Sequence, residues 1–545
     1  MSDIDMHKNF FGRTDVLDLL KRRVIDLKEG YRQNVALLGN EYVGKSAILQ
    51  HFFMNLDDER VIVIYLDLAY KDFDYFFSKF IGSLLYDYSK TKKIQLFEDP
   101  QLLIESTAKY IPHTIQVIKR IQDDFKNGKY HEVFLGLLNL PDVFCTETEM
   151  SCVLIFDEFQ QLEEFPIADV FQLLGKKIMT QKRCFYIVSS SYPKLAQKIL
   201  SEKLSLLFGN FEVLNIEPFD FESSQHFVDR NLAQIKIGGQ LRNFLTDFTG
   251  GHPLYLNLLC QEVLSLCAMH RQNEVYMPIL SHAIENTLFN RWGVISRHFE
   301  LVINDLCNNK GHRLLSDVLV ALANGNHKIE EMTRKINIKK TLLTQRLNRL
   351  IDLGIVIKNG NFHSFKDKLL KYWIKYVYQT RLKDIELSPD KRRRQFKEEL
   401  NRSVESFKLT SRQNFSSRVM ELLYCFDNES FHLNGRKYKL PIFRELIPLK
   451  LRNESGLSYD MIKAMTDEST WFIILKKENL VEQDVNLILK ETKKLERKTG
   501  RCLIISLSNM DKNARLKALQ ERCWIWNENE LNTLLMLFDK PYITR

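Results

Sequence analysis

The sequence lacks any apolar run long enough to form a membrane-spanning helix. Such a helix needs about 20 consecutive apolar residues, and charged residues interrupt every apolar stretch of this chain before that length. The N-terminal residues Met1 to Lys8 also lack the basic start and the apolar core of a secretory signal. We therefore expect a cytoplasmic protein that does not bind a membrane.

The nine cysteines include no Cys-x-x-Cys pair, so their spacing does not favour a zinc site. Cys152, Cys184, Cys260 and Cys502 lie in apolar strings, which indicates buried and reduced thiols. The chain also lacks internal repeats and low-complexity tracts. What remains is an ordinary globular composition, with 45% hydrophobic and 27% charged residues. A length of 545 residues predicts about three to four domains.

Positive charge is concentrated in one part of the chain. The net charge is +9, and residues 366–412 contain 14 Lys and Arg against 7 Asp and Glu, including the run from Lys391 to Arg394. One interpretation is a patch that contacts the phosphates of nucleic acid. The other is a linker helix whose charged face is solvated.

A phosphate-binding loop is the most informative motif. An apolar run from Val35 to Leu38 leads into Gly39-x-x-x-x-Gly44-Lys45-Ser46 and then into a helical pattern. The two glycines let the backbone amides curl around phosphate oxygens, and the helix adds its positive end. We expect Lys45 to reach the β- and γ-phosphates and Ser46 to bind Mg²⁺. The residues predicted to line the bound ATP or ADP are Gly39, Asn40, Glu41, Tyr42, Val43, Gly44, Lys45, Ser46 and Ala47.

An acidic pair, Asp157-Glu158, ends the apolar strand that starts at Ser151. In a phosphate-loop enzyme we expect this strand to lie beside the one that feeds the loop. Asp157 would then hold Mg²⁺ opposite Ser46, and Glu158 would act as general base towards the attacking water. A later strand ends in three serines, of which Ser190 is a candidate to orient that water; serines there are also common turn material.

Further apolar runs at 61–68, 184–190 and 211–216 alternate with helical stretches, which predicts an α/β fold with a parallel sheet covered on both faces. The long stretch at 100–145 predicts two or three inserted helices. Helical patterns dominate residues 220–309. Three shorter helical patterns follow at 313–323, 328–336 and 339–353, and Asn359-Gly360 after them is a hairpin signal. Three helices followed by a hairpin predict a winged helix-turn-helix. The predicted domains are an ATPase core (1–218), a helical lid (219–308), a winged helix (309–380), a basic helical linker (381–412) and a smaller C-terminal α/β domain (413–545).

Several motifs in a fixed order resemble the archaeal-type ATPase family within the STAND class of AAA+-related ATPases. They are Phe10-Phe-Gly-Arg13-x-Asp15, the loop, Asp157-Glu158-Phe159-Gln160, Ile216-Glu-Pro-Phe219, Gly250-Gly-His-Pro253 and Phe362-His-Ser-Phe-Lys-Asp367-x5-Trp373. The resemblance covers about residues 8–380. It implies that Phe11, Gly12 and Arg13 border the adenine and ribose, and that Pro253 packs on adenine. His363 loosely matches a histidine that touches the β-phosphate in relatives; otherwise it is a surface residue of the hairpin.

One departure from that family concerns catalysis. Members often have Gly-Arg before the Ile-x-Pro-Phe motif, and that arginine can serve as a finger; here the pair is Gly209-Asn210. An arginine finger contributes about 10³–10⁵ in rate, and asparagine has no charge. Arg183 is the nearby arginine that could substitute. We therefore expect slow ATP turnover, as in a switch.

The C-terminal domain resembles the restriction-endonuclease-like module that often follows this ATPase. Glu421, Asp460 and Lys476 match its active pattern, whereas Ile474 replaces the second carboxylate, and an apolar side chain cannot bind Mg²⁺. This predicts a nuclease relic that serves for binding, or else an unrelated α/β domain.

The function predicted from the sequence is a switch ATPase whose nucleotide state controls the winged helix and C-terminal module. Double-stranded DNA is an expected partner, through the winged helix and the basic segment 366–412, and so is a homo-oligomer on activation. In relatives the winged helix also acts as an internal latch. Two other functions stay open: a DNA-processing enzyme with an active nuclease, and a DNA-loading initiator similar to origin-recognition proteins.

Overall fold

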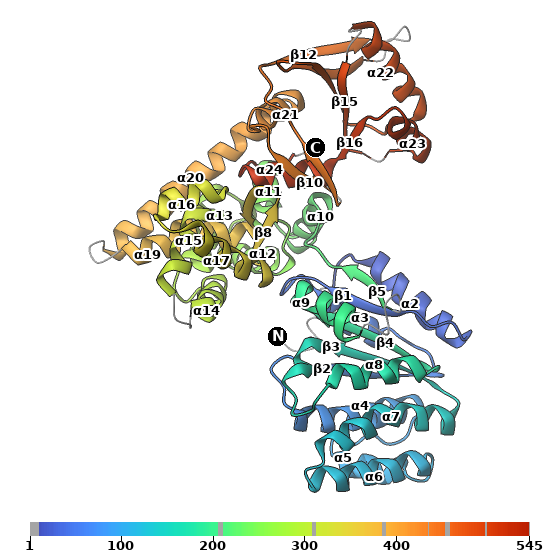
Figure 1. Cartoon of the computed structure of the whole chain (residues 1–545). Helices are drawn as coiled ribbons and strands as arrows, with labels where there is room; N and C mark the ends of the chain where they lie inside the picture. Colours follow the sequence, from blue (N-terminus) through green and yellow to red (C-terminus); the bar gives the residue numbers. More distant parts are fainter. Residues whose placement is uncertain are drawn as a thin grey trace. The chain divides into compact units, whose positions relative to one another are not determined.

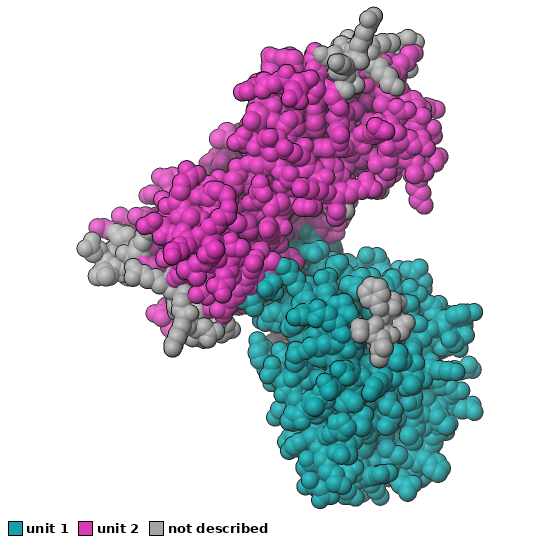
Figure 2. Space-filling view, in the orientation of Figure 1, with its two compact units in different colours: residues 1–219, 252–254, 352–354 teal, residues 220–251, 255–351, 355–545 magenta. Residues whose placement is uncertain are grey.

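The computed structural model describes residues 10–204, 211–307, 312–383, 388–433, 435–452, 458–495, 499–508 and 510–543. The chain forms two compact units (Figure 2). Unit 1 comprises residues 1–219, 252–254 and 352–354, and unit 2 comprises 220–251, 255–351 and 355–545. No helix within the described ranges is both long enough and apolar enough to cross a membrane.

A five-stranded parallel sheet forms the centre of unit 1 (Figure 1). Its order is β2-β3-β4-β1-β5, and every neighbouring pair is parallel. Successive residues of β1 point to opposite faces of the sheet, and each face has its own apolar core. Ala36 and Leu38 belong to one core, and Val35 and Leu37 belong to the other. The strands are β1 (Asn34–Leu38), β2 (Val61–Asp67), β3 (Ser151–Asp157), β4 (Cys184–Ser190) and β5 (Phe211–Asn215). The predicted parallel α/β sheet is thus confirmed.

The helices of unit 1 include the insertion expected between β2 and β3. Three helices, α5, α6 and α7, follow α4 there, in agreement with the two or three predicted for 100–145. The helices are α2 (Thr14–Lys28), α3 (Lys45–Met54), α4 (Phe73–Thr91), α5 (Pro100–Thr107), α6 (Pro112–Lys126), α7 (Tyr130–Thr148), α8 (Val170–Thr180) and α9 (Pro193–Lys198).

The strand order corrects one expectation. We expected β3, which ends in the acidic pair, to lie beside β1, but β4 lies between them. Strand β4 is paired on both of its edges. Its residue Ile187 pairs with Val35 of β1 on one side and with Ile155 of β3 on the other. Apolar strands look alike in sequence, so their order depends on pairing that no local pattern encodes. As a result, the serine-rich end of β4 separates the loop from the acidic pair.

Unit 2 begins with helices and a small two-stranded sheet that the sequence did not suggest. The helices are α10 (Phe221–Asn231), α11 (Gly239–Thr249), α12 (Pro253–Met269, whose first two residues are grouped with unit 1), α13 (Met277–Ile284) and α14 (Val294–Cys307). The strands are β6 (Lys236–Ile237) and β7 (Glu274–Val275), which pair in parallel.

A segment of three helices and a hairpin follows, as expected. We call it the helix–hairpin segment: α15 (His312–Ala323), α16 (Ile329–Ile336), α17 (Lys340–Asp352), β8 (Val356–Asn359) and β9 (Phe362–Phe365). Asn359 pairs with Phe362, so the two turn residues are Gly360 and Asn361 rather than the predicted Asn359-Gly360.

The basic segment consists mainly of helices α18 (Lys368–Trp373), α19 (Gln379–Lys383) and α20 (Pro389–Arg412). Several of its cations form ion pairs with acidic side chains elsewhere in unit 2. Arg393 and Lys397 both pair with the buried Glu285, and Lys368 pairs with Asp247. Part of the positive charge of this segment therefore forms ion pairs within unit 2.

The C-terminal part is a mixed α/β domain. Its sheet has the order β12-β13-β14-β15-β16, antiparallel from β12 to β14 and parallel from β14 to β16. Strand β12 was not predicted, because Pro448 interrupts its pattern; an edge strand tolerates proline. The elements are α21 (Phe415–Leu423), β10 (Ser430–Leu433), β11 (Arg436–Lys439), β12 (Glu445–Arg452), β13 (Ser458–Met465), β14 (Thr470–Lys476), α22 (Glu482–Leu495), β15 (Thr499–Ser506), α23 (Lys512–Gln520), β16 (Trp524–Asn527) and α24 (Glu528–Leu537).

Candidate functional site

The loop between β1 and α3 needs glycine at both of its ends. A Cβ on Gly39 would lie 2.4 Å from the carbonyl oxygen of Ile216, a backbone atom that cannot turn aside as the end of a flexible side chain could. Gly44 has a φ of 100°, in the left-handed region that side chains disfavour. The motif therefore reflects backbone geometry, and it places the loop directly before the N-terminus of α3.

Lys45 is the first residue of α3, and its side chain is held inside the site. It is only 3% exposed. Its Nζ donates hydrogen bonds of 2.8 Å to the carbonyl oxygen of Asn40 and of 2.8 Å to the Oγ of Ser191. An oxygen of Glu158 lies 3.9 Å from the same ammonium. The ammonium is thus positioned by the loop, by the end of β4 and by the acidic pair.

Both carboxylate oxygens of Glu158 accept hydrogen bonds. One accepts from the backbone N–H of Ser191 at 2.9 Å and from the Nε2 of Gln160 at 2.7 Å. The other accepts from the Oγ of Ser191. Because the same Oγ accepts from Lys45, Ser191 links the cation to the carboxylate.

Asp157 lies deeper, at the end of β3, and is 1% exposed. The hydroxyl of Tyr65 on β2 donates to it at 3.0 Å, and so does the hydroxyl of Ser189 on β4. Burial, reinforced by the charge of Asp157, raises the pKa of Tyr65, so this phenol stays a neutral donor. Burial also raises the pKa of Asp67, whose neighbours include Asp157 and Glu158. The carboxyl groups of Asp67, Asp157 and Glu158 therefore lie near one another at this end of the sheet.

The N-terminal motif meets the segment that follows β5. The guanidinium of Arg13 donates to the carbonyl oxygen of Glu217 and lies 4.9 Å from the ring centre of Phe219. Phe11 packs edge-on against the same ring at 5.7 Å. Arg13 also donates to the carbonyl oxygen of Val43 at 3.5 Å. Two motifs about 200 residues apart thus lie together beside the loop.

The residues around Pro253 also touch the loop. The Nε2 of His252 lies 3.2 Å from the carbonyl oxygen of Glu41, and Pro253 is the first residue of α12. The hydroxyl of Tyr192 donates to the Glu41 carboxylate at 3.5 Å. Burial and the Glu41 charge raise the pKa of Tyr192 to about 12.

The structure brings Ser191, rather than Ser190, into contact with Lys45 and Glu158. The hydroxyl of Ser190 accepts from the backbone N–H of Tyr192, and its carbonyl accepts from Gly39. Ser190 therefore supports the loop's backbone.

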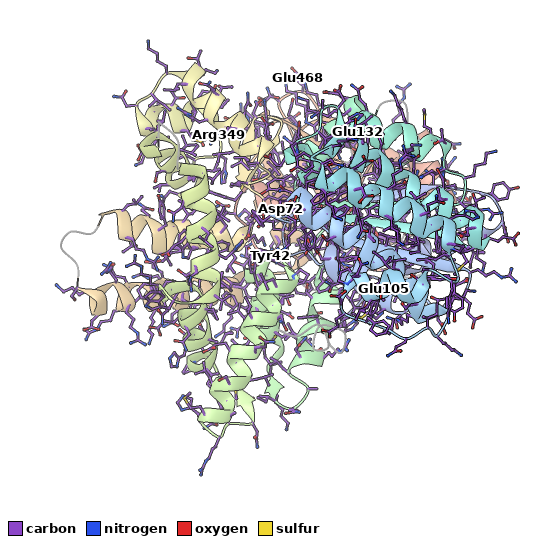
Figure 3. The ribbon with its side chains drawn as sticks, turned by 90° about the horizontal axis from the view of Figure 1, so that it is seen from below. Tyr42, Asp72, Glu105, Glu132, Arg349 and Glu468 are labelled. Carbon is purple, nitrogen blue, oxygen red and sulfur yellow. The ribbon has the colours of Figure 1, made fainter. Side chains whose placement is uncertain are left out.

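Two residues of the loop motif are exposed. They are Ser46 and Tyr42, the second of which is labelled in Figure 3. Sequence reasoning singled out neither Tyr65 nor Ser191; the serine run at 189–191 was the signal for the second.

Arg183 does not fit the role of a finger within its own chain. It immediately precedes β4, whereas the loop and acidic pair lie at the C-terminal ends of the strands. A strand of this length separates the two ends by about 20 Å, and Arg183 donates instead to the carbonyl oxygen of Cys145 at 3.1 Å. The pair Gly209-Asn210 lies outside the described residues.

The C-terminal residues do not assemble as the nuclease pattern requires. Asp460 pairs with Leu475, so it lies on the opposite face of the sheet from the next residue, Lys476. The Lys476 ammonium pairs with Asp484, which also accepts from Tyr459 at 2.5 Å. Burial alone would raise the pKa of Asp484, but hydrogen bonds from Lys476, Tyr459 and the Val481 backbone, together with the charge of Lys476, lower this pKa overall. Glu421 is elsewhere, 3.5 Å from the ammonium of Lys540.

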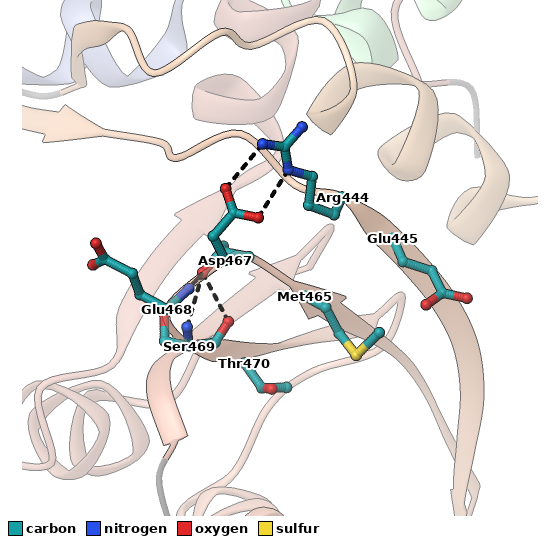
Figure 4. A pocket seen from close by; sticks show the side chains of 8 residues that line it. Arg444, Glu445, Met465, Asp467, Glu468, Ser469 and Thr470 are labelled. Atoms are coloured by element: carbon teal, nitrogen blue, oxygen red, sulfur yellow. Dashed lines mark hydrogen bonds and ion pairs between the residues drawn. The ribbon is translucent and has the colours of Figure 1, made fainter.

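An open hollow of about 640 Å³ lies at the start of β12 and the turn between β13 and β14 (Figure 4). Arg444 and Asp467 form a two-fold hydrogen-bonded ion pair across it, at 3.0 and 2.9 Å. None of the residues that line it is a predicted site residue.

The loop, its lysine and the acidic pair on a parallel sheet define a P-loop ATPase site. The model of a family described as an ATPase domain predominantly from Archaea matches residues 10–259. This match supports an archaeal-type P-loop ATPase domain, which extends from unit 1 into α12. No curated protein matches the chain.

Several solved structures are similar to part of this chain. The Walker-type ATPase PABY2304 of Pyrococcus abyssi has a TM-score of 0.48 and 17% identity, over 67% of this chain and 96% of that one. The Thermotoga maritima RuvB Holliday junction branch migration motor has a TM-score of 0.34 and 12% identity, over 67% and 96%. The Aeropyrum pernix ORC1 protein, solved in complex with DNA, has a TM-score of 0.36 and 11% identity, over 67% and 93%.

Proposed function

We propose that this protein is a slowly hydrolysing, ATP- and Mg²⁺-dependent switch of the STAND class, whose nucleotide state controls a winged helix and a C-terminal binding module. ATP is its substrate. The observation that carries the proposal is the engagement of Glu158 with Lys45, Ser191 and Gln160. The protein's own donors already make three hydrogen bonds to this carboxylate, which has about four acceptor sites, so few positions are left from which it could hold a water molecule.

The residues at this site suit a nucleoside triphosphate with Mg²⁺. Gly39 has no room for a Cβ, which would lie 2.4 Å from the carbonyl oxygen of Ile216, and Lys45 supplies the cation for the β- and γ-phosphates. Ser46 and Asp157 are the oxygen donors that would hold the metal, since hydroxyl and carboxylate oxygens are its preferred ligands. Mg²⁺ supplies neutralisation of the phosphate charge when it is bound.

The proposed switch follows from competition for Lys45. Its ammonium now bonds Asn40 and Ser191 and approaches Glu158. A γ-phosphate would draw the ammonium towards itself and weaken its link to Ser191 and Glu158. Glu158 would then be free to orient and deprotonate water.

Slow turnover is proposed because Asn210 stands where relatives often place a finger arginine. Asparagine cannot stabilise the charge that develops on the transferred phosphoryl group. Arg183 lies at the opposite end of β4 and does not replace it within the chain. An arginine from a second copy, in a homo-oligomer formed on activation, would restore the rate.

Steady-state ATP hydrolysis by the full chain tests this proposal. We expect turnover well below one per second, whereas tens per second, which is typical of fast phosphoryl-transfer enzymes, would overturn the switch. Glu158→Gln should retain nucleotide binding and lose turnover by about 10²-fold or more. Lys45→Ala should lose binding as well. Glu164→Gln, an exposed change nearby, is the matched control.

The helix–hairpin segment is the proposed winged helix, and duplex DNA is its proposed partner. Its last helix, α17, exposes a polar face, and Arg349 on that helix is labelled in Figure 3. Binding that weakens steeply with salt would support this partner. The nuclease alternative is disfavoured, because Asp460 and Lys476 lie on opposite faces of their sheet.

A further inference from the structure

The C-terminal domain contains a second hairpin, β10–β11, that resembles β8–β9 in size. Both hairpins have strands of four residues, and in the second Leu433 pairs with Arg436. Gly435, which directly precedes Arg436, has a φ of 74°. The turn of β8–β9 contacts the edge of strand β10.

The tip of the first hairpin is covered by the second. The Asn359 side chain donates to the carbonyl oxygen of His432 at 3.0 Å and accepts from its backbone N–H at 2.5 Å. This side chain thereby pairs with the edge of β10 as a further strand would. At the neighbouring Gly360, a Cβ would lie 1.8 Å from the carbonyl oxygen of Ser430. The tip of β8–β9 is therefore closed to a nucleic acid.

Contacts behind the tip hold the two hairpins in this arrangement. Phe362 of β9 packs edge-on against Phe426 and Phe538 of the C-terminal domain, at 6.3 and 5.2 Å. Lys328, which bridges to Phe362, forms an ion pair with the buried Glu429. Phe362 and Phe426 belong to the same buried apolar core as Phe431 of β10, so the two hairpins share one core.

The second hairpin is also the more basic one. Strand β11 exposes Arg436, Lys437 and Lys439, whereas β8–β9 has a single lysine, Lys358. Side chains alternate along a strand, so Lys437 and Lys439 share the outer face while Tyr438 between them is buried. Among the described residues, no ion pair engages Lys437 or Lys439. This outer face carries charge that the fold does not use.

We propose that the outer face of β10–β11 binds the phosphate backbone of duplex DNA in place of the covered β8–β9 tip. The inference rests on the proposed DNA-binding function and adds which surface performs it. Helix α17 then presents base-reading groups: Thr341, Gln345 and Asn348 follow one another at helical spacing and are all exposed. Gln and Asn side chains can bond adenine with both of their polar atoms.

The geometry favours B-form DNA over duplex RNA. The major groove of B-DNA is wide enough for a helix such as α17, while the corresponding groove of duplex RNA is deep and narrow. Lysines on β10–β11, which contacts the tip of the hairpin that follows α17, would add salt-dependent contacts that carry no sequence preference. In this proposal α17 contacts the bases, and β10–β11 contacts the phosphates and positions the protein on the duplex.

Fluorescence anisotropy of the full chain with labelled duplex DNA, over a range of salt concentrations, tests the inference. Lys437→Gln/Lys439→Gln should weaken binding about tenfold and reduce the slope of log affinity against log salt by about two. Lys437→Arg/Lys439→Arg should bind as the natural protein does. The matched control is Lys391→Gln/Arg394→Gln on the exposed face of α20, which should leave affinity unchanged.

The outcomes separate this inference from the proposed function. If the natural protein binds no duplex even at low salt, both fail. If it binds, and Gln345→Ala/Asn348→Ala weakens it while the hairpin variant does not, only the hairpin inference fails. Loss of binding in the α20 control instead of the hairpin variant would also overturn it. Equal or tighter binding of an RNA duplex of the same sequence would overturn the assignment to DNA.

Discussion

The Nζ of Lys45 lies 2.8 Å from the Oγ of Ser191, and this contact joins the phosphate-binding loop to the end of β4. The same hydroxyl donates to Glu158. A single serine thus connects the group that binds phosphate to the group proposed to activate water. Its position depends on β4 lying between β1 and β3.

Ser191→Ala should lower the turnover number about tenfold with little change in ATP affinity, because one hydroxyl that orients Glu158 is lost. Ser190→Ala should affect turnover less, since its hydroxyl accepts from the backbone N–H of Tyr192. Steady-state kinetics on both variants, together with nucleotide titration, measure this difference. A larger loss of turnover in Ser190→Ala than in Ser191→Ala would contradict the geometry.

Gly360→Ala should destabilise unit 2 by about 1–3 kcal/mol more than Gly435→Ala, as overpacking costs are of this size. Both glycines have positive φ values, 61° and 74°, so both variants strain the backbone. At Gly360 the new Cβ would meet the carbonyl oxygen of Ser430, whereas a Cβ at Gly435 would have no atom of the described, non-adjacent residues within 4 Å. Urea unfolding of the two variants makes the comparison. Equal losses would mean that the two hairpins do not dock.

Lys476→Met should destabilise the C-terminal domain by about 1–3 kcal/mol, because the Asp484 carboxylate loses a charged partner in a largely buried site. Lys476→Met/Asp484→Leu should recover part of this loss, since both charges are then removed. Asp460→Ala, an exposed change on the other face, should be close to neutral. Denaturant unfolding provides the measurement. Plasmid cleavage with Mg²⁺ or Mn²⁺ that Asp460→Ala abolishes would instead favour the nuclease.

The stability of unit 2 should fall as the pH drops from 6.5 towards 4. Burial, with a smaller effect of Lys358, lowers the pKa of His363 from 6.5 to about 4. A histidine whose pKa is lower in the folded state binds more protons when unfolded, so folding loses free energy as the pH falls through this window. His363→Asn should flatten the profile of melting temperature against pH, whereas His131→Asn, an exposed change in α7, should not. An unchanged slope in His363→Asn would sink this prediction.

The same burial bears on the role that resemblance suggested for His363. The side chain is 2% exposed, and its backbone N–H donates to the carbonyl oxygen of His327. It is neither a surface residue of the hairpin nor, in this arrangement of unit 2, an exposed ligand. A role towards the β-phosphate would require β9 to rearrange.

The sequence by itself determined the strand, loop and helix at 34–54, because the glycines, lysine and apolar run act through local backbone geometry. It also determined the other core strands, the inserted helices and the helix–hairpin segment, whose periodicities are local signals. The acidic pair was recognisable for the same reason. Each of these features lies within a few consecutive residues.

Only the tertiary structure decided which of these local features meet. Strand pairing placed β4 beside β1 and selected Ser191 over Ser190. Strand register put Asp460 and Lys476 on opposite faces, because a shift of one residue reverses the side of a sheet. The docking of β10 onto Asn359 joins residues 73 positions apart. Such contacts depend on packing between distant segments, for which no local sequence pattern exists.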